Sequence, residues 1–510
     1  MLREPSAITE PGHDSGPVVA AAAAVAGVPA SVQADVRNGE VLLPALGTIR
    51  VPLLDNGLPP RQVTIEVSVH NDAVTLSLRN KTDTVIVTQQ CPAATESWEP
   101  PTRIATGHIA RLDVTLTTTG PLRDIYGVPT DFHSPPADDW RQVVEAGWAL
   151  LEAERPQHAA AIAAGVRTLV PVPPHPDSDM ISCTFDSAFG AVFLALPPNP
   201  ETFAVTLVHE FQHAKLCAAL DLVPLHTAGT EAVYYAPWRE DPRPLGGLLH
   251  GIYAYLGVAQ FWEAHRRCAP DRALFAHVRF ARWREDTWQA CQGILGESAF
   301  TEAGKVFIAA IAAELQQLRD VDVPDEAADI AARIALDTAV CWRLRSLRAD
   351  PAAVNKLATA WISQTQTELP PVETTVEHIS RAKPVARTRK LLTFRRISDA
   401  SASGSAPEAD RLYGLGRFEQ AADAYQKRIR RDPADLDAWA GLAVSISPQD
   451  PGHQALQRIP EVVAEIYRQA DLLGPTRESP LQLARWLTQK LPAERSTTVP
   501  VARNLTAAPE

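Results

Sequence analysis

Short segments in which apolar and polar residues alternate dominate the chain between about residues 31 and 130. Such alternation puts the apolar side chains on one face of a β-strand. Turn residues such as Asp55-Asn56-Gly57 separate the segments, so we predict a small antiparallel sheet. The predicted strands are residues 40–43, 63–69, 74–78, 85–87 and 112–116. Residues 1–17 are polar and rich in proline and glycine and are expected to be disordered, which leaves 18–134 as a β-rich N-terminal region.

The spacing of apolar residues becomes helical after residue 135. The segments with this spacing include residues 137–165, 303–318 and 325–347. Two further strands are predicted at 168–171 and 188–196, directly before a helix over 202–220. We therefore predict an α+β fold in which residues 135–365 form a mainly α-helical domain.

An abrupt change of composition marks a linker at residues 366–406. The linker begins near Pro370-Pro371 and ends near Ser401-Ala402-Ser403-Gly404-Ser405. Between them lies a basic run that contains Arg381, Lys383, Arg387, Arg389, Lys390, Arg395 and Arg396. We expect this run to be a solvated flexible segment, and the alternative is a docking strip for an acidic peptide.

Beyond the linker, residues 407–510 are predicted to form a separable α-helical module. Residues typical of a tetratricopeptide repeat recur with the expected spacing, namely Gly416, Phe418, Ala421, Tyr425, Pro433 and Trp439. Arg428 departs from the pattern, which usually has a small residue there. One repeat cannot bury its own apolar face, so helices around 453–473 and 479–490 are expected to complete the stack. We expect such a module to recruit a protein partner rather than to do chemistry.

Composition narrows the class of protein. Apolar residues make up 45% of the chain and charged residues 21%, as in a soluble globular protein. The net charge of -12 argues against a nucleic-acid-binding protein, because phosphates attract basic surfaces. The six cysteines are scattered, and the short alanine run at residues 20–24 is interrupted by Gly27-Val28-Pro29. We therefore expect a cytoplasmic protein without disulfides, signal peptide or membrane span.

The most informative motif is His209-Glu210-Phe211-Gln212-His213, an H-E-x-x-H sequence inside the predicted helix. Histidines four residues apart project from one face of a helix, so both can bind one metal ion with Glu210 beside it. The simpler interpretation is an amphipathic helix with two partly exposed histidines, which this apolar context disfavours. The predicted strand pair before the helix suits such a site, because an edge strand can hold an extended peptide by backbone pairing.

A catalytic metal site needs a third protein ligand besides the two histidines. The extended zincin pattern fails, because Leu216 and Ala219 stand at its glycine and histidine positions. The candidates are His226, Glu231, His250 and Glu263. We favour His250, which lies at an apolar helix start, over a surface-loop histidine at 226 and a solvated helix face at 263. The alternative for His250 is a core histidine that is satisfied by other partners.

The segment from Tyr234 to Pro244 combines aromatic, arginine and proline residues. Arg239 and Arg243 are candidates to grip a dicarboxylate or a peptide carboxylate, since a guanidinium group binds a carboxylate through paired hydrogen bonds. An equally favoured interpretation is a rigid loop whose arginines pair with Glu240 and Asp241. The aromatic residues that we expect to contact the substrate are Tyr235 and Trp238.

With its surroundings, this motif resembles the "HEXXH motif domain" family, whose members accompany gene clusters for peptide modification. The likeness covers about residues 165–270 and lies in residues 207–213, 220–225, 236–239 and 241–244. Members are understood as iron- and 2-oxoglutarate-dependent β-hydroxylases of ribosomally made precursor peptides. The resemblance implies iron at His209 and His213. Within it, we assign His250 as the third ligand and Arg239 or Arg243 to the distal carboxylate of 2-oxoglutarate.

Three functions follow from these interpretations. In a hydroxylase, Fe(II) and 2-oxoglutarate carry the chemistry, and Glu210 fixes a ligand or a bound water. In a zinc metallopeptidase, Glu210 is the general base that deprotonates a zinc-bound water. In a non-catalytic helical-repeat protein, the chain only binds a partner. The resemblance favours the hydroxylase, with a precursor peptide as substrate and with neither nucleic acid nor membrane as partner.

Overall fold

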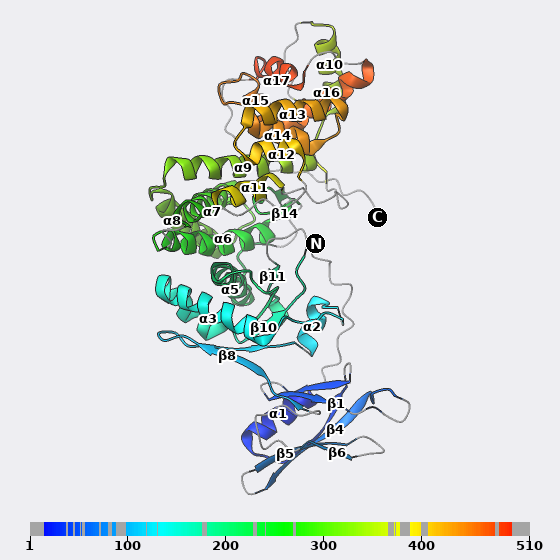
Figure 1. The fold of residues 1–510 in the computed structure, drawn as a ribbon, viewed down its shortest axis with the longest axis vertical. Helices are drawn as coiled ribbons and strands as arrows, with labels where there is room; N and C mark the ends of the chain where they lie inside the picture. The colour runs from blue at the N-terminus through cyan, green and yellow to red at the C-terminus, as the bar shows by residue number, and fades with distance from the viewer. Residues whose placement is uncertain are drawn as a thin grey trace. The chain divides into compact units, whose positions relative to one another are not determined.

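The computed structural model describes residues 15–491 apart from internal gaps. The gaps are residues 37–38, 44–45, 52, 54–56, 71–72, 80–83, 88–97, 119, 130, 176–180, 228–231, 240, 269–271, 366–371, 373, 378–387, 399–405 and 475–478. Most of the segment expected to be disordered therefore lies outside the described residues. Small sheets precede α5 (Pro200–Leu222), and the chain after it is mainly helical (Figure 1). This confirms the α+β class at a coarse level.

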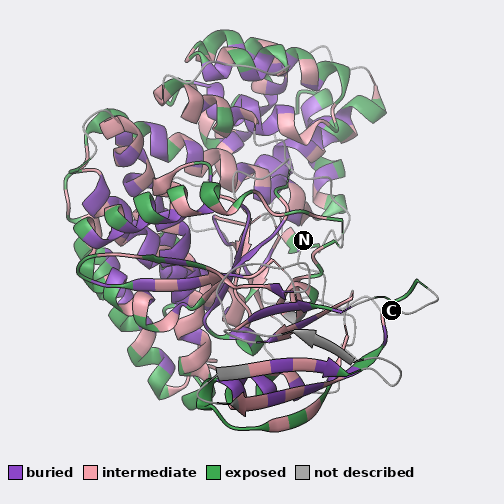
Figure 2. Ribbon diagram, turned by 60° about the horizontal axis from the view of Figure 1, so that its bottom comes forward, coloured by how far each residue is buried: buried purple, intermediate pink, exposed green. Residues whose placement is uncertain are grey.

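The chain forms two compact units, residues 1–214 and 215–510, and the boundary lies inside α5. The first unit opens with an antiparallel sheet in the order β1-β4-β5-β6. Its strands are β1 (Ala30–Asp35), β4 (Gln62–His70), β5 (Ala73–Arg79) and β6 (Thr84–Val87). In β4 the buried residues are Val63, Ile65 and Val67, so every second side chain enters the core. This alternation appears as purple and pink bands along the strands (Figure 2).

Helix α1 (Gly16–Ala26) packs on this sheet, although the sequence predicted disorder up to residue 17 and a β-rich region from residue 18. Its Ala20, Ala21 and Ala24 share an apolar cluster with Ile65. Alanine has the highest helix propensity, and its small side chain lets the helix lie close to the strands. The helix was missed because it is apolar on every side and carries no period-3.6 stripe. A three-stranded sheet follows, made of β2 (Glu40–Leu43), β3 (Gly47–Arg50) and β7 (Trp98–Glu99).

A five-stranded sheet in the order β11-β12-β10-β9-β8 lies closest in sequence to the H-E-x-x-H helix. Its strands are β8 (Thr102–Thr106), β9 (Leu112–Leu116), β10 (Thr168–Pro171), β11 (Ser182–Cys183) and β12 (Ala191–Leu194). The sheet is mixed, because β10 pairs in parallel with both β9 and β12. The parallel connection from β9 to β10 needs a long crossover. Three helices supply it: α2 (Pro121–Tyr126), α3 (Ala137–Glu154) and α4 (Pro156–Gly165).

Glu152 of α3 anchors the turn between β8 and β9. Its carboxylate is buried and accepts hydrogen bonds from the backbone N–H groups of His108 at 3.0 Å and Ala110 at 2.6 Å, and also from Ile109. Burial alone would raise the pKa of the Glu152 carboxyl, but these three donors outweigh it and hold the pKa below its ordinary value of 4.5. One side chain therefore satisfies the donors of a whole turn.

We expect Glu152→Gln to destabilise the protein by about 2 kcal/mol at pH 7, because a neutral amide accepts these bonds more weakly than a carboxylate. Since the folded-state pKa is lowered, the stabilisation is present above the pKa of the unfolded chain and is lost as pH falls through the folded-state value. Urea unfolding of wild type and variant at pH 7 and at about pH 3.5 measures this. The difference should shrink at the lower pH, and an equal difference at both would contradict it. Glu145→Gln, on an exposed position of the same helix, is the matched control.

The second unit, residues 215–510, is mainly helical. Its long helices are α6 (Leu245–His265), α7 (Ala273–Ile294), α8 (Glu302–Arg319) and α9 (Asp325–Ser346). The last two match the predicted helices at 303–318 and 325–347. Two strand pairs interrupt the helices: β13 (Val233–Tyr234) with β14 (Arg243–Pro244), and β15 (Leu347–Ala349) with β16 (Thr374–Val376). Among the described residues, no helix combines the length and the apolar character needed to cross a bilayer.

The C-terminal helices place the tetratricopeptide-like positions in a core. The helices are α12 (Glu408–Gly414), α13 (Phe418–Arg431), α14 (Leu436–Ser445), α15 (His453–Arg458), α16 (Pro460–Leu473) and α17 (Pro480–Thr488). Ala421, Tyr425 and Trp439 are completely buried, and the indole N–H of Trp439 donates to the Pro433 carbonyl at 3.0 Å. Arg428, the departure from the repeat pattern, forms hydrogen bonds to Asp435 at 3.0 and 3.2 Å.

These helices share their core with helices that precede the predicted linker. Val340 and Leu344 of α9, and Leu357 of α10 (Pro351–Ile362), belong to the same apolar cluster as Trp439 and Tyr467. A buried ion pair also joins Arg343 of α9 to Glu461 of α16, with Nε at 3.0 Å from the carboxylate. The expected separable module is therefore continuous with α9 and α10 in one packed unit. Whether its surface recruits a partner stays a prediction.

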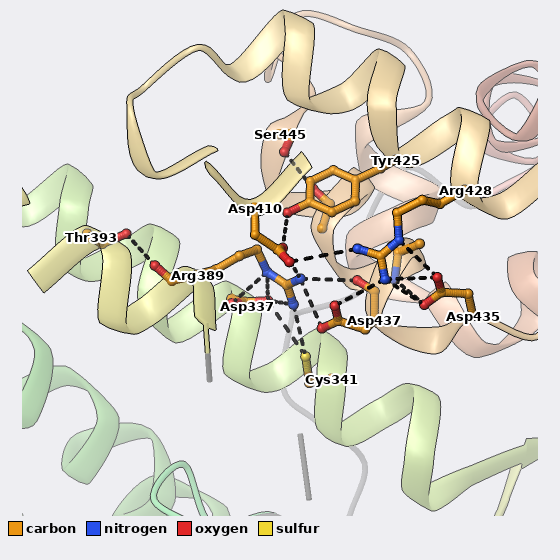
Figure 3. A network of polar contacts seen from close by, with 12 residues as sticks. Asp337, Cys341, Arg389, Thr393, Asp410, Tyr425, Arg428, Asp435, Asp437 and Ser445 are labelled. Carbon is orange, nitrogen blue, oxygen red and sulfur yellow. Dashed lines mark hydrogen bonds and ion pairs between the residues drawn. The ribbon is translucent and has the colours of Figure 1, made fainter. Parts of the chain in front are cut away.

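The basic run of the predicted linker departs from the expectation of a solvated segment. Residues Thr388–Ile397 form helix α11, and Arg389 is 1% exposed. Its guanidinium contacts Asp337 of α9 at 2.8 Å, Asp410 of α12 at 3.3 Å and Asp437 of α14 at 3.0 Å (Figure 3). Burial alone would lower the pKa of Arg389, but the carboxylates raise it well above its ordinary value. Arg381, Lys383 and Arg387 lie outside the described residues.

Candidate metal centre

Helix α5 carries both histidines of the motif, as predicted. It starts at Pro200, whose fixed φ suits a first helical position, and the Asn199 side chain accepts a hydrogen bond from the Thr202 N–H at 2.8 Å. His209 and His213 lie one turn apart, with their Nε2 atoms separated by 3.1 Å and their rings at 81°.

This separation fits two ligands of one metal ion. Nitrogens about 2.1 Å from a shared ion and 3.1 Å from each other subtend an angle of about 95° at the ion. In the metal-free protein, the same separation allows a hydrogen bond between the rings. His209 keeps some exposed surface, yet the surrounding protein lowers the pKa of its imidazole to about 4 by desolvation. His209 is therefore neutral at pH 7, which is the form that binds metals.

Glu210 is held by two hydroxyl groups of the neighbouring sheet. Its side chain is 2% exposed, and its two carboxylate oxygens accept hydrogen bonds from Ser182 at 2.7 Å and Thr184 at 3.2 Å. Burial raises the pKa of Glu210 to about 7, although both hydroxyl groups act to lower it. Because side chains of a strand alternate, Ser182 of β11 and Thr184 two residues later point to the same side. Ser182 and Thr184 were not predicted as site residues. Their signal in the sequence is the two-residue spacing of two hydroxyl side chains in the segment before β12 and α5.

The candidate third ligands belong to the second unit or lie outside the described residues. His250 of α6 is half-buried, and its pKa is lowered by burial and by the neighbouring His226. Glu263 pairs with Arg267 at 3.0 Å, but its side chain is only 14% exposed, so it does not lie on a solvated helix face as expected. Glu231 lies outside the described residues. In the described part of the chain, no group of three or more histidine, cysteine or acidic side chains is arranged to hold a metal. The assignment of His250 stays a prediction.

Arg239 and Arg243 converge on one carboxylate in the second unit. Asp241 accepts hydrogen bonds from Arg239 at 2.8 Å and from Arg243 at 3.2 Å. Burial alone would raise the pKa of Asp241, but the two guanidinium groups lower it. This pairing is the alternative interpretation given for the loop, while Glu240 lies outside the described residues. Two cations share a single anion, so the cluster keeps a net charge of about +1 at neutral pH.

The two aromatic residues expected to contact the substrate both pack against other aromatic rings. Tyr235 meets Trp342 edge to face, with ring centroids 5.2 Å apart. Trp238 stacks on Tyr255 at 4.6 Å and covers Gly251 of α6, where a Cβ atom would lie 2.4 Å from the indole. Both side chains therefore shape the loop itself. Their contact with a substrate stays a prediction.

The first unit also contains a cavity of about 720 Å³. Its walls include Leu42, Thr48, Arg103, Thr115 and Arg167, and neither motif histidine nor Glu210 lines it. A large pocket is the usual first candidate for a binding site, but this one brings together no metal-binding donor set. We therefore take the chemistry of α5, and not this cavity, as the candidate functional centre.

Comparison with known proteins adds no assignment: no protein-family model matches the chain, and no curated protein matches it.

Proposed function

We propose that the chain is an iron- and 2-oxoglutarate-dependent hydroxylase that acts on the β-carbon of a residue in a peptide. His209, His213 and His250 would hold the iron. The observation that supports this choice best is the environment of Glu210, whose two oxygens both accept hydrogen bonds from hydroxyl groups of the sheet. The family resemblance of the motif region supplies the identity of the cofactors.

In a peptidase, Glu210 would have a different role, that of a general base. A general base must present a carboxylate oxygen to the metal-bound water and take its proton. Here each oxygen already accepts one hydrogen bond, from Ser182 or Thr184, and the side chain is almost completely buried, which limits its access to a metal-bound water. This arrangement suits a residue that orients the metal-binding helix against the sheet. A hydroxylase needs such a fixed support and no proton transfer at this position.

The metal, the two histidines and the arginine cluster would each have a role in the proposed hydroxylase. Bound iron with 2-oxoglutarate and O2 supplies the oxidising power for hydroxylation. Neutral His209 offers a nitrogen lone pair to the metal, and His213 places its Nε2 atom 3.1 Å from that of His209. The net positive Arg239–Asp241–Arg243 cluster can accept one further carboxylate, such as the distal carboxylate of 2-oxoglutarate, through charge-assisted hydrogen bonds.

A zinc metallopeptidase is the second candidate, and one observation favours it. The pKa of Glu210 is raised to about 7, which is near the value that suits a general base at neutral pH. In this alternative, Ser182 and Thr184 would hold the carboxylate until a substrate arrives. The two enzymes differ in their need for 2-oxoglutarate.

The deciding test measures succinate formation from 2-oxoglutarate by the protein loaded with Fe(II). We expect Arg243→Lys to raise the 2-oxoglutarate concentration needed for half-maximal rate at least ~10-fold, which is about 1.4 kcal/mol of binding. A lysine cannot reproduce the paired geometry of a guanidinium group, and iron affinity should not change. Arg431→Lys, at an exposed position of the same unit, is the control. Peptide cleavage with Zn²⁺ alone and no succinate from any variant would establish the peptidase instead.

A further inference from the structure

Strand β11 is an edge strand, and it lies beside the motif helix. It stands at one end of the five-stranded sheet, where it pairs with β12 in the register Ser182↔Leu194 and Cys183↔Phe193. In the described part of the chain, no strand pairs with its other side. Residues 181–184 are half-buried, so they keep surface that solvent reaches.

The direction of the backbone groups of β11 follows from one hydrogen bond. The Ile181 carbonyl accepts from the Ala195 N–H at 2.9 Å, so the main chain of Ile181 faces β12. In an antiparallel pair, the N–H and C=O groups of successive residues point alternately toward and away from the partner strand. The main-chain groups of Ser182 and Thr184 therefore point away from β12, toward the open edge.

The same two residues reach the motif helix through their side chains. Ser182 and Thr184 donate to Glu210, which follows the metal-binding His209 directly. The open edge of the sheet is thus fixed to the residue next to the proposed metal ligand. A strand added at this edge would run alongside the part of α5 that carries the site.

We propose that the free edge of β11 is the docking strand for the substrate, which binds as an extended peptide that extends the sheet. The main-chain groups of Ser182 and Thr184 would pair with those of the peptide. The occupant is a peptide because only a polypeptide backbone repeats donors and acceptors at the spacing of a strand edge. Recognition through the main chain tolerates many side chains, and it requires an extended peptide with free amide N–H groups. The inference rests on the proposed function only for what happens to the peptide after docking.

The test compares two synthetic libraries on the immobilised, metal-free full-length protein. Both contain randomised acetylated octapeptide amides without proline or cysteine, and one is N-methylated at every second residue. We expect at least ~10-fold greater retention of the unmethylated library, and slower hydrogen exchange at residues 181–184 when it is bound. Equal retention of both libraries, no retention of either, or a self-associated dimer protected at 181–184 without peptide would overturn the proposal.

Two variants at one position separate backbone pairing from the hydroxyl contact. Thr184→Pro removes an N–H that points to the open edge without removing a bond to β12, and edge strands tolerate proline. Thr184→Val removes the hydroxyl and keeps the N–H. We expect Thr184→Pro to lose peptide retention and Thr184→Val to keep it, and the reverse order would overturn the proposal. If Thr184→Pro fails to fold, the library comparison on the wild type still decides.

This assay contains neither metal nor 2-oxoglutarate, so the two proposals can fail separately. Retained peptide without succinate formation would remove the hydroxylase assignment and keep the docking strand. Succinate formation without peptide retention, or without discrimination against N-methylated peptides, would remove the docking strand alone.

Discussion

Replacing His209 or His213 by alanine is expected to lower metal affinity at least ~100-fold, which corresponds to about 2.7 kcal/mol, because each change removes one of few protein ligands. The fold should survive, since neither ring belongs to the apolar core. Metal content after dialysis against a weak chelator, and calorimetric titration with Fe(II) under anaerobic conditions or with Zn²⁺, measure the effect. Full metal occupancy in either variant would refute the assignment of the pair.

The same measurement tests the third ligand and includes its control. His250→Ala should weaken binding to a similar extent if His250 binds the metal. His133→Ala, at an exposed position of the first unit, should bind like the wild type. An unchanged affinity in His250→Ala would transfer the role to Glu231, Glu263 or His226.

Deleting residues 407–510 is expected to unfold much of the second unit. The deletion would expose Val340, Leu344 and Leu357, which are fully or almost fully buried against the removed helices. It would also remove Glu461, the ion-pair partner of Arg343. Circular dichroism, thermal unfolding and limited proteolysis of the truncated chain measure the loss. A folded, monomeric fragment with a cooperative transition would restore the separable module.

Two sets of point variants complement this experiment. Glu461→Ala should destabilise the full-length chain by about 3–5 kcal/mol, and replacing both Arg343 and Glu461 by methionine should recover most of that loss. Equal stability of wild type and Glu461→Ala would show that the ion pair contributes little.

Local pattern predicted the long helices and several strands, but not strands such as β1, β3 and β8. The strand at residues 112–116 and the helices around 202–220, 303–318 and 325–347 came from periodicity, because one face of each element is buried. Helix α1 was missed, because an alanine-rich segment without polar residues has no face that a period can reveal. The five-stranded sheet is mixed and not antiparallel, because strand pairing depends on the helical crossover between β9 and β10.

The residues of the candidate site were likewise only partly predictable from the sequence. The His209–His213 pair is predictable, because both residues lie on one helix and their spacing alone fixes their proximity. The hydroxyl contacts of Ser182 and Thr184 were not predicted, since they depend on how β11 packs against α5. Arg389 was expected to be exposed to solvent. Its partners Asp337, Asp410 and Asp437 are distant in sequence, so no local pattern predicts these contacts.

The buried position of Arg389 has a consequence for how this segment can change in evolution. Three carboxylates from three helices bind its planar guanidinium, a geometry that the point charge of a lysine does not reproduce. Among homologous chains, position 389 is therefore expected to keep an arginine and not to exchange it for lysine. In an alignment, an arginine fixed at this position would mark the residue that determines where helix α11 binds.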